Sequence, residues 1–144
     1  MLVCMKIKPE DKWFSRCVRE RANWVCECCE KQYEEGSQGL HCSHFFSRRH
    51  TATRWSPINA AAHCFSCHQR LGGNPIEFAD WIATYLEKHY GPMAYPTLIE
   101  QKNRIVKVSK KDRQEMAIHF RGQYEWLKRI RAEESGRIEF EAYI

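Results

Sequence analysis

Acidic residues are missing from the middle of the chain. The sequence has 18 Asp and Glu residues among 144, but none lies in the stretch 37–76. The same stretch carries four arginines, and the whole chain has a net charge of +5. A basic surface without carboxylates favours contact with phosphates, although arginines on a solvated face would give the same pattern. We predict that the DNA-binding residues are Arg48, Arg49, Arg54 and Arg70.

Long apolar runs are missing as well. No apolar run of about 18 residues is present, so we expect no transmembrane helix and no membrane partner. The first six residues contain too short an apolar segment for a secretory signal peptide, which predicts a cytoplasmic protein. Hydrophobic residues make up 43% of the chain, which is enough for one modest packed domain over 1–144.

Cysteine, in contrast, is abundant, with eight residues. In a chain without a secretory signal, paired Cys-x-x-Cys motifs are more often metal ligands than disulfide partners. Two such motifs occur, Cys26/Cys29 and Cys64/Cys67, and tetrahedral structural zinc needs four ligands of this kind. We predict a structural Zn²⁺ site on these four thiolates. Cys28, His41 and His63 remain possible substitutes, and Cys4, Cys17, Cys28 and Cys42 are expected to be buried or free thiols.

The first half of the chain is predicted to combine helices with a small hairpin. Pro9 is suited to the first turn of a helix over 9–21, with Trp13, Phe14, Cys17 and Val18 as its apolar stripe. A tight knuckle follows at Cys26. Short strands are expected over 40–46 and 58–62, with a basic loop between them and a helix opening at 65–71.

The second half is predicted to be helical. Asn74 with Glu77 and Ser109 with Asp112 have the spacing of helix N-terminal capping boxes. The helices expected here are 75–90, about 95–102, and from 109 to about 134, with Ala117, Phe120, Tyr124 and Leu127 facing inward in the last. The predicted domain thus has an N-terminal helix (9–23), a zinc and hairpin core (24–73) and a helical C-terminal part (74–134).

Three polar residues between and beside the cysteine pairs have the chemistry of phosphodiester hydrolysis. His44 is a candidate general base, because imidazole titrates near pH 7 and can activate water. His68, directly after Cys67, is a candidate ligand for a catalytic Mg²⁺ or Mn²⁺ ion. A carbonyl or amide, such as that of Asn59, would fix the tautomer of His44. The predicted catalytic residues are therefore His44, Asn59 and His68.

The pattern His44, Asn59, Cys64-x-x-Cys67-His68 resembles the HNH endonucleases of the ββα-metal type. The resemblance implies an α+β, treble-clef-like core braced by zinc, with His44 as general base, Asn59 orienting the hairpin and His68 binding the catalytic ion. Many members have Asp or His directly before the base, where this chain has Ser43. The second ligand of the catalytic ion therefore stays open. Either fewer protein ligands hold the ion, or a distant carboxylate does.

Over 26–131 the chain more closely resembles the NinG/Rap family of phage recombination proteins. The resemblance implies a structure-specific endonuclease for branched DNA, such as Holliday junctions or D-loops, in a phage-infected host cytoplasm, and a homodimer is possible because two strands must be cut. Two alternatives remain: a zinc-dependent DNA-binding module without cleavage, and a treble-clef adaptor for other proteins. The residues that carry the resemblance are His44, the run Arg54-Trp55-Ser56-Pro57-Ile58-Asn59, Cys64-x-x-Cys67, Gly72-Gly73-Asn74, Tyr90-Gly91, Tyr124 and Leu127.

Overall fold

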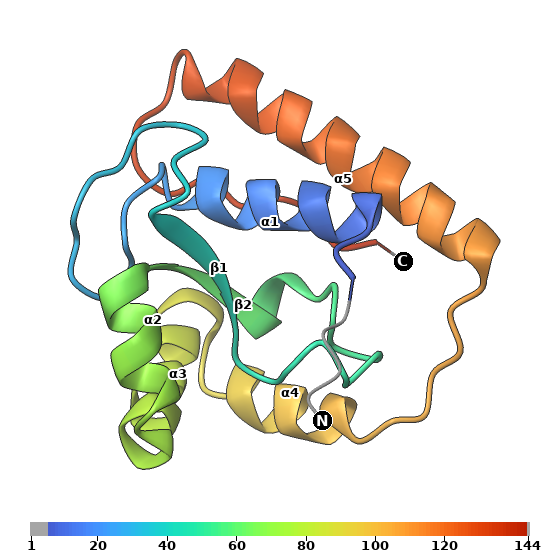
Figure 1. The fold of residues 1–144 in the computed structure, drawn as a ribbon, viewed down its shortest axis with the longest axis horizontal. Helices are drawn as coiled ribbons and strands as arrows, with labels where there is room; N and C mark the ends of the chain where they lie inside the picture. The colour runs from blue at the N-terminus through green and yellow to red at the C-terminus, as the bar shows by residue number, and fades with distance from the viewer. Residues whose placement is uncertain (1–5, 144) are drawn as a thin grey trace.

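The structure, a computed structural model, describes residues 6–143 and has a small α+β fold (Figure 1). Within these residues, five α-helices surround one two-stranded antiparallel sheet. The predicted fold class is confirmed at this level. The elements in chain order are α1 (Pro9–Arg21), β1 (Leu40–His44), the 3₁₀ turn η1 (Pro57–Asn59), β2 (Ala60–Cys64), α2 (Phe65–Gly72), α3 (Pro75–Tyr90), α4 (Ala94–Lys102) and α5 (Lys110–Arg131).

The helices α1 and α5 lie side by side over one face of the sheet (Figure 1). Phe14, Cys17 and Val18 of the α1 stripe are buried as predicted, whereas Trp13 is only partly buried. Phe14 meets Phe120 of α5 edge-on with ring centroids 5.2 Å apart. The predicted capping box of α5 is confirmed, since Ser109 and Asp112 exchange side-chain to backbone hydrogen bonds. The inner face of α5 differs by one position from the prediction, because Met116 is buried there and Ala117 is only partly covered.

The hairpin pairs Leu40 with Cys64 at one end and His44 with Ala60 at the other. The second strand begins two residues later than predicted. The reason is that Pro57 starts a 3₁₀ turn, and the Asn59 side chain bonds to the connecting loop instead of lying in the ladder. Because side chains alternate along a strand, His41 and Ser43 lie on one face of the sheet and Cys42 and His44 on the other.

The helix α3 covers the face of the sheet opposite α1 with Ile82, Tyr85 and Leu86. Its predicted capping box is wrong. Asn74 makes no side-chain cap bond and instead donates to the Arg70 carbonyl at 2.7 Å, while Glu77 pairs with Arg70. The helix still begins at Pro75, whose fixed φ suits a first turn.

The segment after α5 belongs to the core. Ile138 and Phe140 are buried against α1 and α5, although this tail is too short to give a periodic signal in the sequence. Arg137 pairs with Glu27 and donates to Tyr85 and Tyr90, so it fastens the tail to the knuckle segment and to α3. Among the helices of residues 6–143, none has the length and apolarity needed to cross a bilayer.

Candidate metal centre and catalytic cavity

The structure brings the four predicted cysteines together from three segments. Cys26 and Cys29 come from the loop after α1, Cys64 ends β2, and Cys67 lies in the first turn of α2. Their sulfur atoms all lie within 4.8 Å of one another, and the Sγ atoms of Cys29 and Cys64 are 3.8 Å apart. Sulfur ligands of a tetrahedral zinc ion, each bound at about 2.3 Å, lie about 3.8 Å from one another. The donor set and spacing therefore fit a structural metal such as zinc.

Backbone geometry explains why these cysteines converge. Val25 and Gln32 form an isolated β-bridge, which folds the knuckle back on itself, and Glu30 adopts φ 66° to make the turn. Backbone N–H groups point at the sulfurs. The Cys64 N–H donates to the Cys26 sulfur at 3.2 Å, and the Cys67 N–H donates to the Cys64 sulfur at 3.4 Å. Burial raises the pKa of Cys64, but the bond from the Cys67 N–H and bonds with the neighbouring thiols outweigh it and lower that pKa to about 7.

The remaining cysteines and the two alternative ligands lie outside this group. Cys17 is buried and donates to the Phe120 carbonyl at 3.2 Å, and burial raises its pKa. Burial also raises the pKa of Cys42 to about 12. Both side chains are therefore protonated thiols. Cys28 is partly exposed and accepts a bond from Arg70, and Cys4 lies outside the described residues. Within 6–143, the four cysteines are the only group of three or more His, Cys, Asp or Glu side chains placed closely enough to hold one metal ion. Neither His41 nor His63 belongs to this group.

His44 ends β1 and is held as a single tautomer. Its Nε2 lies 3.1 Å from the backbone carbonyl oxygen of Arg54. A carbonyl only accepts, so Nε2 carries the proton and Nδ1 keeps a free lone pair. Burial lowers the pKa of His44 to about 4, so the ring is neutral at pH 7. The partner that fixes the tautomer is thus a carbonyl ten residues away, and the predicted candidate Asn59 does not bond to His44.

Asn59 is fully buried and holds the loop that joins the two strands. Its Oδ1 accepts the Phe46 N–H at 2.9 Å, and its Nδ2 donates to the carbonyls of Phe46 and Thr53, both at 3.0 Å. Both ends of the loop are thereby tied to one amide. Asn59 therefore fixes the loop of the hairpin, and its effect on the orientation of His44 stays a prediction.

His44 and His68 line one cavity of about 530 Å³. His68 is half-buried on α2, and burial, followed by the nearby His41, lowers its pKa. Three basic residues also line it, Lys12 and Arg19 of α1 and Arg48 of the loop. Neither Lys12 nor Arg19 was predicted, because they lie in α1, outside the acid-free stretch and the cysteine motifs. A cavity with a neutral imidazole and several cations is suited to a phosphodiester.

Arg54 is not available to DNA, contrary to the prediction. Its side chain is 3% exposed, and two of its nitrogens bond to the two oxygens of Asp11 at 3.0 and 2.6 Å. Burial raises the pKa of Asp11, but bonds from Arg54, the Lys8 N–H and Trp55 outweigh it and hold that pKa below its usual value. The carboxylate that pairs with Arg54 in the acid-free stretch therefore comes from Asp11 of α1. Arg54 supports His44 by anchoring the segment whose carbonyl holds the ring.

The other three predicted arginines differ in their surroundings. Arg49 is exposed and lines a shallow pocket with Lys102 and Arg104, whereas Arg48 is partly covered and lines the cavity of His44. Arg70 is 47% exposed, but Glu77 neutralises it. Arg54 and Arg70 thus have carboxylate partners from outside the acid-free stretch.

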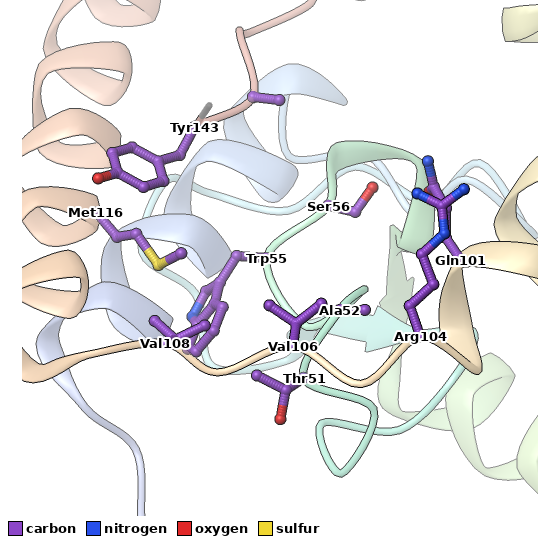
Figure 2. Close-up of a pocket in the computed structure, with 11 residues that line it drawn as sticks. Thr51, Ala52, Trp55, Ser56, Gln101, Arg104, Val106, Val108, Met116 and Tyr143 are labelled. Atoms are coloured by element: carbon purple, nitrogen blue, oxygen red, sulfur yellow. The ribbon is translucent and has the colours of Figure 1, made fainter.

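A second cavity, of about 290 Å³, contains none of the predicted catalytic residues (Figure 2). Trp55, Val108, Met116 and Tyr143 gather on one side of it in Figure 2, and Gln101 and Arg104 lie on the other. The buried Trp55 ring separates this space from Asp11, to which its Nε1 donates at 3.0 Å. The candidate catalytic residues His44 and His68 line the other cavity instead.

Comparison with known proteins gives no assignment of its own: no family model matches the chain, and neither does any curated protein or solved structure.

Proposed function

We propose that this protein is a metal-dependent DNA endonuclease of the ββα-metal (HNH) type, braced by a four-cysteine zinc site. The observation that carries the proposal is the state of His44: neutral, with Nε2 bonded to a carbonyl and Nδ1 unprotonated, in a basic cavity that it shares with His68. The order of knuckle, hairpin and helix, with the second cysteine pair at the helix start, supports a treble-clef arrangement of the core.

The residues present can divide the work of hydrolysis among themselves. His44 Nδ1 accepts a proton from water, whose oxygen attacks phosphorus while the opposite P–O bond breaks and its oxygen leaves. Lys12, Arg19 and Arg48 hold the negatively charged substrate in the cavity. Asn59 keeps the loop, and hence the Arg54 carbonyl, in position. A divalent ion near His68, when bound, would stabilise charge on the phosphate and on the leaving oxygen.

The proposed substrate is branched DNA, in recombination of the kind served by the NinG/Rap family. This part of the proposal is supported by the sequence resemblance, and the basic cavity supports nucleic acid in general. A pair of subunits would cut the two strands of a junction.

The test compares wild type with His44→Ala on a labelled four-way junction and on a linear duplex of matched sequence, with Mg²⁺ or Mn²⁺. His119→Ala serves as the control, because His119 lies on α5 outside the cavity and contacts the tail at the Glu141 carbonyl. All three proteins must first show equal zinc content and equal melting temperature.

Cleavage by wild type and by His119→Ala, with loss of at least about a hundredfold in His44→Ala, is the expected result for a general base. Faster cutting of the junction than of the duplex would support the branched substrate. Salt-dependent binding without cleavage by any of the proteins would replace the proposal with a zinc-dependent DNA-binding module. Absence of both binding and cleavage would favour a protein adaptor.

A further inference from the structure

His41 and His68 form a pair of imidazoles on the face of the sheet that also carries Ser43. The Nδ1 atoms of the two rings are 3.2 Å apart, although the residues are separated by 27 positions in the chain. The ring centroids lie 5.5 Å apart with an interplanar angle of 83°, so the rings meet edge to face and do not stack. Both side chains are partly exposed, and an ion from solvent can therefore reach them.

The spacing of the two nitrogens matches that of neighbouring ligands on one ion. Nitrogen ligands bound at about 2.0–2.1 Å in adjacent tetrahedral or octahedral positions lie about 2.9–3.4 Å from each other. In the absence of an ion, the same contact is a hydrogen bond in which one Nδ1 donates and the other accepts. Only one proton then occupies the space between the rings, and an ion would replace it.

The neighbouring positions do not offer a better second ligand. Ser43, which occupies the position directly before the base, is fully buried and its hydroxyl has no hydrogen-bond partner. His63, the register partner of His41, is also fully buried and does not complete a three-ligand group with the pair. The carboxylate that lines the cavity, Asp11, is already bonded to Arg54. His41 is therefore the described side chain placed to join His68.

We infer that His41 is the second protein ligand, beside His68, of the catalytic divalent ion, and that this two-imidazole site binds Mn²⁺ in preference to Mg²⁺. The role of the ion in cleavage rests on the proposed function, whereas its binding does not. Mg²⁺ prefers oxygen ligands and keeps its waters, while imidazole nitrogen suits first-row transition metals. Two protein ligands leave the remaining positions for water and phosphate oxygens, and His68 also lines the cavity of His44.

The test measures Mn²⁺ binding to the zinc-loaded protein without DNA, by electron paramagnetic resonance. Wild type is expected to bind Mn²⁺ at least tenfold more tightly than Mg²⁺ in competition, with nitrogen couplings from two imidazoles. In His41→Ala the affinity for Mn²⁺ should fall at least tenfold and one nitrogen coupling should disappear. His119→Ala should match wild type. Zinc content and melting temperature are measured on each variant, so a general loss of folding is recognised.

Two results would overturn the inference: Mn²⁺ binding by His41→Ala that equals wild type in affinity and nitrogen coupling, or Mg²⁺ binding as tight as Mn²⁺ binding. The variant His44→Ala separates this inference from the proposed function, because it should bind Mn²⁺ normally and yet fail to cleave. Mn²⁺ binding that requires His41, combined with no cleavage by wild type, would contradict the proposed nuclease activity and support the metal site. Cleavage by wild type, combined with Mn²⁺ binding that does not depend on His41, would support the nuclease and contradict the metal site at His41.

Discussion

The cysteine group and the histidine cavity are neighbours in the chain but differ in nearly every physical respect. The cysteine group has four converging sulfurs, three of them on buried residues, with backbone N–H groups aimed at them. The histidine cavity has a volume of about 530 Å³ and partly exposed imidazoles. A closed ligand set is typical of structural metal sites, and open positions are typical of catalytic ones. Under the proposed function, stability and reactivity therefore depend on different side chains within one small core.

The two regions also differ in how their residues are supported. The cysteines are positioned by local turns, such as the one closed by the isolated β-bridge between Val25 and Gln32 at the knuckle. His44 depends instead on a distant chain of contacts, in which Asp11 holds Arg54 and the Arg54 carbonyl holds the ring. Disturbing the first region should unfold the protein, whereas disturbing the second should leave a folded protein that is less stable or less active.

The largest expected effect comes from removing a sulfur ligand. Cys64→Ser should abolish the cooperative fold, because structural zinc contributes on the order of 10 kcal/mol, comparable to the whole stability of a small domain. Circular dichroism and zinc content measure this effect. Cys28→Ser is the matched control, since Cys28 lies outside the cysteine group, and it should melt like wild type. A Cys64→Ser protein with an unchanged melting temperature would contradict the structural role of the site.

The next effect concerns the support of His44. Arg54→Met leaves Asp11 buried without its partner and should cost about 3–5 kcal/mol of unfolding free energy, measured by urea denaturation of the zinc-loaded protein. Arg104→Met breaks an exposed pair with Glu100 and should cost about 1 kcal/mol or less. Equal costs for the two variants would show that the buried pair has no special role.

A smaller effect is expected from the buried His63, whose ring nitrogens have no hydrogen-bond partner. Burial lowers the pKa of His63 to about 3, below the unfolded value of about 6.5. The unfolded state therefore binds more protons below pH 6.5, and stability falls as the pH drops from there towards 3, by about 1 kcal/mol per pH unit. His63→Leu should reduce this slope between pH 6.5 and 5. The slope is measured by urea denaturation at several pH values. An unchanged slope would show that groups other than His63 cause the pH dependence.

The smallest expected effect concerns the salt dependence of DNA binding by the predicted arginines. Arg48→Gln should reduce the slope of log affinity against log salt by about 1, as expected for one lost phosphate contact. Arg70→Gln should change it less, because Glu77 already neutralises Arg70. Fluorescence anisotropy with a labelled duplex at several salt concentrations measures both slopes. A larger change for Arg70→Gln than for Arg48→Gln would reverse the assignment of the binding surface.

Local sequence signals predicted the parts of the molecule that depend on local structure. Pro9 and the Ser109 capping box mark helix starts that the structure places at the expected residues. The spacing of the cysteine pairs predicted a group that the structure brings together. In each case the information lies within a few residues of the feature, where turn geometry and ligand spacing have few alternatives.

Features that depend on distant contacts were not predicted. The stretch 37–76 contains no carboxylate, yet Asp11 and Glu77 reach into it from α1 and α3, and no local pattern reveals this. The pairing of His41 with His68 likewise depends on how α2 packs against β1. The buried tail residues Ile138 and Phe140 are part of the core only because α1 and α5 leave a space for them.

Cys67 and His68 are consecutive residues in the first turn of α2. Under the proposed function, this adjacency makes the supply of zinc during synthesis a control on enzymatic activity. A newly made chain that has not captured its ion cannot hold the start of α2 in place, and so cannot present His68 to the cavity. The nuclease would then be harmless to nearby DNA until the same step completes its fold and its site.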